Sequence, residues 1–305
     1  MTATLRPPPV TSRRSGRRAE QLDTALGFNA PRGALATIAR WALQILIVVI
    51  FAGPLLVLLI NSFTPVIDPT RLTLFPTEFT LANFTEAIHR DVLKYLVNSF
   101  VVVGGGLLLQ IVVSISAAYA LARKRFPGMR LIFLLILSTL MLPEEVLAIP
   151  LSLVLADVPV IGVNLVGSLL GMIIPVGAWA FAILVMTEFM REIPLELEEA
   201  ARLDGAGDIR IFWSVVLPLC KPALGVLGIF GFTMIWDQYM LPLLVARDAG
   251  QFTLPLALRT LRSDEQVGIG VLLAASLLAL LPSVIAFIAM QRQFMRGLTS
   301  GAIKG

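Results

Sequence analysis

The chain has 305 residues, of which 57% are hydrophobic and only 14% are charged, and its formal net charge is +4. Soluble domains are nearer half apolar and a quarter charged, so the surplus apolar surface is expected to face lipid. One cysteine, Cys220, excludes an internal disulfide and a cysteine-based zinc site, and one histidine, His89, leaves no histidine metal cluster. The same scarcity argues against a membrane enzyme.

Residues 1–40 form a basic, proline-rich N-terminal stretch. Arg13, Arg14, Arg17 and Arg18 follow a run of prolines, and such a composition does not fold alone. The apolar segment that follows is long enough to span a membrane and ends in no clear small-residue cleavage site, so we do not interpret it as a signal peptide. We expect a disordered cytosolic tail, with a twin-arginine export signal as the alternative.

Six apolar segments follow in chain order, each with the roughly 20 mainly apolar residues that a membrane-crossing helix needs. They cover residues 41–62, 96–121, 131–155, 165–190, 223–245 and 267–290. These runs are too long and too uniformly apolar to be strands of a barrel. The sequence therefore predicts an all-α membrane protein, with six transmembrane helices in a domain over residues 41–292.

The lysines and arginines set the expected orientation of these helices. With the N-terminus in the cytosol, the basic residues left on the outer side are Arg71, Arg90, Lys94, Arg247, Arg259 and Arg262. All the others fall inside, as the positive-inside rule requires. Both termini are thus expected in the cytosol, and residues 293–305 are expected to form a cytosolic C-terminal tail.

The outer loops are expected to contain one short helix. Thr80 can cap an amphipathic helix that carries Phe84, Ala87 and Ile88 ahead of the second span. We expect this helix to lie on the outer membrane surface. The outer connection 157–164 is rich in turn residues.

The inner loop between the fourth and fifth spans, residues 192–220, is expected to form two short helices. Pro194 suits the first position of a helix, and the glutamates just after it favour the positive end of the helix dipole. Gly205 can adopt the left-handed conformation that ends a helix, Asp208 can cap a second helix, and Pro218 can close it. On physical grounds alone, an ordinary amphipathic loop packed on the membrane surface is an equal alternative.

The same loop carries a longer pattern. Glu199-Ala200-Ala201 is followed by Gly205 and then by Val215-Val216-Leu217-Pro218, which resembles the EAA loop of bacterial ABC importer permeases. The family usually has Ile where Val215 stands. Residues 79–84, 117–128 and 291–305 are similar to the maltose-type carbohydrate-uptake permeases, so the match covers nearly the whole chain after residue 40. The resemblance implies the type I ABC importer permease fold.

In that family the EAA loop is a coupling helix that docks into a groove on the ATP-binding subunit. Carried over to this sequence, the coupling positions are Glu199, Ala200, Ala201, Asp204, Gly205, Val215, Leu217 and Pro218. The positions similar to the family's ATPase-contacting tail are Gln291, Arg292, Gly297 and Gly301. The implied partners are a second homologous permease, an ATP-binding-cassette ATPase dimer and an extracytoplasmic solute-binding protein. The implied location is the bacterial cytoplasmic (inner) membrane.

The chain carries no recognisable nucleotide-binding loop. A Walker lysine must be followed by Ser or Thr, whereas the lysines here precede Tyr95, Arg125, Pro222 and Gly305. We therefore expect a non-catalytic subunit without a cofactor or metal of its own, with ATP and magnesium bound by the separate ATPase. The resemblance implies import of a sugar or a related small polar solute, and glycerol phosphates and polyols are the alternatives within the family.

Polar residues inside two of the predicted spans are candidates for lining a solute pathway. They are Glu144, Glu145, Trp236, Asp237, Gln238 and Tyr239. If each span is one straight helix, Glu145 and Asp237 lie about 22 Å from the inner end, at one level of the bilayer. An aromatic ring beside hydrogen-bonding groups suits a sugar, and the acidic groups favour a neutral solute. The alternative is that these groups lie near the outer headgroups or satisfy backbone freed by Pro143 and Pro242.

A secondary transporter is the main alternative from another functional class. It would show inverted repeats and helices broken at the midplane, and the sequence contains no convincing internal repeat. A channel would need a filter motif and a four- or fivefold assembly, and no such motif is visible. Co-purification of a tightly bound ATPase would separate the importer from these alternatives.

Overall fold

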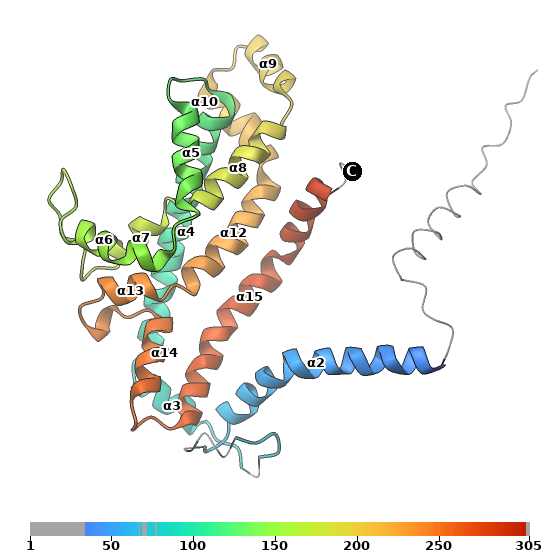
Figure 1. Ribbon diagram of the computed structural model, residues 1–305, viewed down its shortest axis with the longest axis vertical. Helices are drawn as coiled ribbons and strands as arrows, with labels where there is room; N and C mark the ends of the chain where they lie inside the picture. The colour runs from blue at the N-terminus through green and yellow to red at the C-terminus, as the bar shows by residue number, and fades with distance from the viewer. Residues whose placement is uncertain (1–33, 67, 69–71, 77, 303–305) are drawn as a thin grey trace, which may run out of the picture. The chain divides into compact units, whose positions relative to one another are not determined.

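The structure is a computed structural model that describes residues 34–66, 68, 72–76 and 78–302 (Figure 1). The expected N-terminal tail therefore lies outside the described residues as far as residue 33. The chain divides into two compact units, Met1–Val57 and Leu58–Gly305.

The described part of the first unit is a single helix, α2 (Ala34–Ser62), whose last turn continues into the second unit. The helix begins ahead of the apolar segment 41–62, so residues 34–40 are helical although the sequence analysis placed them in the tail. The alanines and leucine at its start have high helix propensity, which favours this extension. Large apolar side chains such as Ile45 and Phe51 are exposed along α2, as in a helix that contacts lipid or another membrane protein.

The second unit contains all the other described helices. They are α3 (Ala82–His89), α4 (Val92–Arg123), α5 (Met129–Thr139), α6 (Glu144–Ala156), α7 (Leu170–Val176), α8 (Ala180–Glu192), α9 (Leu195–Leu203), α10 (Asp208–Ile211), the π-helix η2 (Phe212–Val216), α11 (Leu217–Leu219), α12 (Lys221–Trp236), α13 (Met240–Val245), the 3₁₀ helix η3 (Ala249–Gln251), α14 (Leu254–Ser263) and α15 (Ile269–Ala302). Between residues 78 and 302 the only strand-like pairing is one isolated bridge, from Val158 to Val163.

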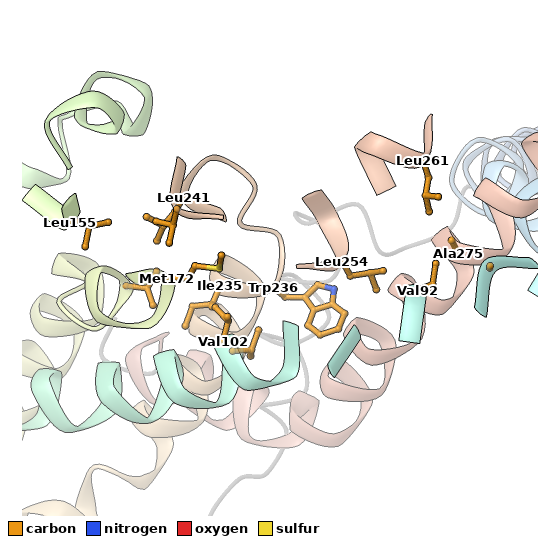
Figure 2. Packing of buried hydrophobic residues seen from close by; sticks show 14 of the residues in the cluster. Val92, Val102, Leu155, Met172, Ile235, Trp236, Leu241, Leu254, Leu261 and Ala275 are labelled. Atoms are coloured by element: carbon orange, nitrogen blue, oxygen red, sulfur yellow. The ribbon is translucent and has the colours of Figure 1, made fainter. Parts of the chain in front are cut away.

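The long helix α4 forms the centre of the second unit. It packs along α7, α8 and α12, and α12 in turn packs along α15 (Figure 1). Buried apolar side chains fill these contacts in two clusters. Figure 2 shows part of the first, in which Val102 of α4, Met172 of α7 and Trp236 of α12 belong to one core. The second joins α4 and α8 to loop 192–220 around Ile211.

Among the described residues, four helical segments are long and apolar enough to cross a membrane. They are Thr37–Ser62, Val92–Arg123, Leu170–Glu192 and Ile269–Gln291. Two further segments qualify only as bent pairs of helices, so the structure offers between four and six spans. The helical membrane architecture predicted from the sequence is therefore confirmed.

The predicted segment 131–155 is not one straight helix, because α5 and α6 meet at an angle of 111°. Pro143 immediately precedes α6, lacks a backbone N–H and biases Leu142 away from helical backbone. The position in the bilayer predicted for Glu145 assumed one straight helix. It does not apply, because Glu145 lies in the first turn of α6, beyond the bend.

Two other predicted segments are also divided. Segment 223–245 is interrupted by residues 237–239, which separate α12 from α13. Segment 165–190 is interrupted by residues 177–179, just after Pro175 at the end of α7. A continuous helix through either segment is therefore wrong, because hydropathy reports the length of an apolar run and not whether its helix is interrupted.

The predicted outer helix forms α3, and the hydroxyl of Thr80 accepts a hydrogen bond from the N–H of Ala82 at 3.0 Å. This helix does not lie free on a membrane surface, however. Ala87 is fully buried, and α3 packs against α15. The side-chain amide of Asn83 donates to the carbonyl of Thr64 at 2.7 Å, which holds α3 against the end of α2 in the same unit.

Arg90 joins α3 to the segment between α14 and α15. Its guanidinium lies 2.8 Å from the carboxylate of Glu86 and 2.9 Å from that of Asp264. The hydrogen bond to Glu86 raises the pKa of Arg90 above its ordinary value, burial opposes this, and the hydrogen bond to Asp264 raises the pKa further. Arg90 therefore stays charged over the whole physiological pH range.

Candidate functional site

Loop 192–220 lies at the end of the second unit where α4 ends and α5 begins (Figure 1). Two helical arms, α9 and the run α10–η2–α11, are joined by a turn, as predicted. Gly205 in this turn has a φ of 80°, the left-handed conformation expected of a helix stop. No atom lies within 4 Å of the position that a Cβ on Gly205 would occupy, so backbone conformation and not space favours glycine here.

Three residues at the ends of these arms differ from their predicted roles. Pro194 precedes α9 as its N-cap and is not its first residue, a shift within the usual variation of helix ends. Asp208 begins α10, but its side chain accepts no capping hydrogen bond. Pro218 does not close the second arm, because the π-helical turn η2 leads on into α11 through Leu219.

The carboxylate of Asp208 makes ion pairs instead. Its Oδ2 lies 2.5 Å from Nζ of Lys124, which directly follows α4, and its Oδ1 lies 3.5 Å from Nη2 of Arg202 in α9. Asp208 thereby links the second arm both to the first arm and to the end of α4. All three side chains are between 40% and 53% exposed, so solvent screens these pairs.

A buried ion pair attaches the first arm to α4. Nε of Arg123, the last residue of α4, lies 2.6 Å from Oε1 of Glu198, and these side chains are only 4% and 2% exposed. The Nε–H does not point along this contact, so it is an ion pair and not a hydrogen bond. Nη2 of Arg123 also donates to the carbonyl of Ile193 at 2.7 Å. The sequence analysis missed this pair, because it treated Glu198 as one of several glutamates at a helix start.

The predicted coupling residues divide into an exposed group and a packed group. Glu199, Ala200, Asp204, Gly205 and Pro218 are exposed, whereas Ala201, Val215 and Leu217 are half-buried against the second core cluster. Ala201, Asp204 and Val215 come together around a small cleft of about 170 Å³ between the two arms. The structure therefore brings members of both arms together and leaves the glutamate of the EAA pattern free to meet another molecule.

The loop also exposes large apolar side chains that the sequence analysis missed. Leu203 is 90% exposed, Ile209 77% and Trp213 62%. Ile209 and Trp213 line one open hollow on the second arm. Their spacing of four residues on an inner loop is the signal that could have found them. Exposed apolar side chains clustered in a polar loop are typical of protein contact surfaces.

The predicted C-terminal contacts lie on α15, whose helix continues through Ala302 into the segment expected to be a tail. The side chain of Gln291 donates to the carbonyl of Ile288 at 3.1 Å, within the same helix. Arg292, Gly297 and Gly301 are helical, and the side chain of Arg292 is outside the described part of the structure.

The six polar residues nominated for a solute pathway do not form one group. Glu144 and Gln238 line the same cavity, which has a volume of about 360 Å³. Trp236 is only 4% exposed and lies in the core of Figure 2, with its ring 5.3 Å from that of Phe100 and 5.5 Å from that of Phe232.

The other three residues lie away from this cavity. Glu145 and Asp237 are exposed, one in the first turn of α6 and the other at the end of α12. Tyr239 lines a separate hollow beside α14, with the guanidinium of Arg259 at 5.1 Å from its ring. The breaks in the helices thus separate side chains that are neighbours in the sequence.

Comparison with known proteins identifies a family. Residues 110–297 match the family described as "Binding-protein-dependent transport system inner membrane component". The sn-glycerol-3-phosphate transport system permease protein UgpE of Yersinia pestis is 40% identical over 205 residues, which are 67% of this chain and 71% of the relative. The melibiose/raffinose/stachyose import permease protein MelC of Bacillus subtilis is 31% identical over 254 residues, which are 83% of this chain and 91% of the relative.

A solved structure has the same fold. It belongs to a bacterial ABC transporter involved in the import of the acidic polysaccharide alginate, and it superposes with a TM-score of 0.74 at 21% sequence identity. The superposition covers 94% of this chain and 100% of the other.

Proposed function

Because the chain belongs to the family of binding-protein-dependent transport system inner membrane components, we propose that it is the permease subunit of an ABC importer for a sugar or a related small polar solute. The observation that carries this proposal is loop 192–220, which exposes its EAA glutamate, Glu199, and is held to α4 by a buried ion pair. The relatives transport glycerol phosphate in one case and oligosaccharides in another. A glycerol phosphate or a polyol is the alternative solute.

The proposed topology has six spans, in which α5 and α6 together form one crossing and α12, which follows loop 192–220, contributes another. Both termini and loop 192–220 lie on the cytosolic side of a bacterial cytoplasmic membrane. The distribution of lysine and arginine supports this orientation. Residues 1–33 form a basic cytosolic tail, and the end of α15 lies on the side of the ATPase.

The proposed partner at loop 192–220 is an ATP-binding-cassette ATPase, which binds the ATP and magnesium that this chain does not. Ala200 is exposed and small, so a groove on the partner can approach α9 closely. Leu203, Ile209 and Trp213 supply exposed apolar area for the same contact. A second homologous permease completes the membrane part, and an extracytoplasmic binding protein delivers the solute.

Force on the loop would reach the spans by two routes. The first arm is joined to α4 through Arg123 and Glu198, and the second arm continues through η2 and α11 into α12. Movement of the ATPases toward each other would therefore tilt α4 and α12 together. Because α4 packs along α7, α8 and α12, such a tilt changes the contacts of the whole second unit.

The experiment compares two glycines with the same local geometry. Gly205 and Gly128 both have a φ of 80°, and neither has an atom within 4 Å of the position that a Cβ would occupy. Gly205 lies in loop 192–220, whereas Gly128 lies just before α5 and outside that loop. Aspartate tolerates the left-handed conformation better than most residues, so both substitutions cost similar backbone strain.

We expect Gly205→Asp to abolish co-purification of the ATPase and solute uptake, and Gly128→Asp to preserve both. Retention of both activities by Gly205→Asp would remove the docking role of the loop. The helix breaks are also expected of a secondary transporter, so uptake in vesicles must depend on internal ATP. Uptake driven by an ion gradient without ATP would favour that class instead.

A further inference from the structure

Three helix breaks of the second unit surround one cavity. Thr139 and Leu142 belong to the break between α5 and α6, Trp179 to the break between α7 and α8, and Gln238 to the break between α12 and α13. In Figure 1, α6, α7 and α13 lie beside one another, and α13 packs against both of the others. Non-helical backbone at membrane depth is tolerated where it lines a cavity or is buried in protein. The convergence of three breaks therefore marks this cavity, named here the three-break cavity, as a candidate binding site.

The three-break cavity has the size and lining of a small-molecule site. Its volume of about 360 Å³ lies within the range of roughly 300–1,000 Å³ that ligand pockets occupy. Most of the lining is apolar, and Trp179 supplies an aromatic ring. Thr139, Glu144 and Gln238 supply hydrogen-bonding side chains from three different breaks or their edges. A mixture of aromatic and hydrogen-bonding groups suits a solute that carries both C–H and hydroxyl groups.

Backbone and buried polar groups hold this lining in place. Glu144 opens α6, and the N–H groups in the first turn of a helix have no intrahelical carbonyl partners. Behind the cavity, the amide of Gln110, which is 1% exposed, donates to the carbonyl of Val176 at 3.3 Å. Val176 is the last residue of α7 and lines the cavity, so Gln110 satisfies a carbonyl at the break from the protein side.

The charge of the lining selects among the solutes of the relatives. Glu144 is the only ionisable side chain that lines the three-break cavity in the described part of the chain, and no lysine or arginine lines it. Glu144 is exposed at the edge of this mainly apolar cavity, and like charges repel, so its carboxylate repels a phosphate or carboxylate group that enters. Anion sites are instead built from arginine, lysine or several helix N-termini.

We propose that the three-break cavity is a solute-contact site of this subunit that accepts neutral, hydroxyl-rich solutes and rejects anionic ones. The proposal rests on the proposed function and narrows it, because it excludes sn-glycerol 3-phosphate although a permease for that solute is 40% identical to this chain. Glu144 and Gln238 provide hydrogen bonds to hydroxyl groups, Trp179 provides a surface for C–H groups, and Glu144 provides the charge selection.

The test measures the charge preference of the cavity without needing the natural solute. In a Cys220→Ala background, Gln238→Cys introduces a thiol into the cavity of the full complex with its ATPase and second permease. A methanethiosulfonate reagent transfers its thioalkyl group to this thiolate to form a mixed disulfide, and methanesulfinate leaves. The rates for a trimethylammonium reagent and for a sulfonate reagent are each divided by the rate of the same reagent with 2-mercaptoethanol.

We expect the normalised rate at Gln238→Cys to be about tenfold higher for the cationic reagent than for the anionic one. Glu144→Gln should reduce this ratio to near one. Glu145→Gln is the matched control, because Glu145 is the adjacent acidic residue and does not line the cavity; it should change the ratio by less than about twofold. Raffinose should slow the labelling, and sn-glycerol 3-phosphate should not.

The proposal would be overturned if the cationic reagent labels Gln238→Cys no faster than the anionic reagent after normalisation. It would also be overturned if Glu144→Gln and Glu145→Gln change this rate ratio equally. The proposal would also be overturned if neither reagent labels Gln238→Cys while both label the exposed control Asp237→Cys. That result would mean that another part of the assembled complex fills the cavity. Retention of ATP-driven uptake by the Cys220→Ala parent separates these outcomes from a failure of the proposed function. If the complex of the unsubstituted chain contains no ATPase, the proposed function itself is wrong.

Discussion

Loop 192–220 and the three-break cavity differ in where their residues come from. Most side chains that shape the loop lie within a short stretch of sequence, and Arg123, Lys124 and the apolar side chains of α4 and α8 hold it from outside. The cavity is lined by α5, α6, α7, α8, α12 and α13, and no two of its polar groups are close in sequence except Thr139 and Glu144. A site of the first kind can be predicted from a motif, whereas a site of the second kind depends on where separate helices break.

The two regions also use charge differently. In the loop, Glu198, Arg202 and Asp208 take part in opposite-charge pairs, one of which is buried. The cavity has a single acidic side chain without a basic neighbour in its lining. Paired charges fix a geometry for a protein partner, and an unpaired charge beside a cavity discriminates between solutes.

The largest expected effect comes from breaking the buried pair. Arg123→Met leaves the buried Glu198 with only the longer contact to Arg202, at 3.9 Å, which should cost about 3–5 kcal/mol of stability and abolish transport. The double variant Arg123→Met with Glu198→Leu should recover most of this loss, because no buried charge remains unpaired. Thermal unfolding of the purified complex and its ATP-driven uptake would measure both effects. Additive losses in the double variant would show that the pair is not coupled.

A second prediction tests the apolar surface of the loop. Trp213→Ala should weaken binding of the ATPase by about 2 kcal/mol, or roughly thirtyfold, because large exposed aromatics often dominate a protein contact. Val160→Ala is the control, since Val160 is also fully exposed but lies in the connection between α6 and α7. Titration of the ATPase onto the permeases in detergent measures the dissociation constant. Equal affinities for the two variants would exclude Trp213 from the contact.

A third prediction tests the support of the cavity. A Cβ on Gly231 would lie 2.3 Å from Oε1 of Gln110, which holds the carbonyl of Val176. Gly231→Ala should therefore displace Gln110 and destabilise the protein by about 1–3 kcal/mol. Combining it with Gln110→Ala should relieve the clash, so the two losses should be less than additive. Denaturation of the purified complex measures them, and strict additivity would contradict this contact.

The smallest effect is expected at the exposed pair of the loop. Lys124→Met removes one of the two basic partners of Asp208 and should lower stability by no more than about 1 kcal/mol, because both groups are solvated. The difference in stability between Lys124→Met and the parent protein should disappear at high salt. A loss as large as that of Arg123→Met would show that burial does not distinguish the two pairs. The comparison uses the same unfolding measurement at low and high ionic strength.

Much of the fold and of loop 192–220 could be predicted from local chemistry. Long apolar runs require helices in lipid, and a glycine between two amphipathic helices predicts a left-handed turn, which Gly205 adopts. The pattern from Glu199 to Pro218 was sufficient to predict the family, which the comparisons confirm. The buried partner of Glu198 was not predictable, because the closeness of Arg123 depends on how α4 ends against α9.

The sequence by itself determined that this is a helical membrane protein with an exposed loop at residues 192–220, because both properties depend on hydropathy and on residues close together in the chain. Only the tertiary structure decided which polar residues share a site. Glu144 and Gln238 line one cavity, and Trp236 is buried although it lies two residues from Gln238, because three predicted segments are interrupted within their length. Hydropathy does not show where a helix is interrupted, so it could not predict which side chains distant in sequence line the same cavity.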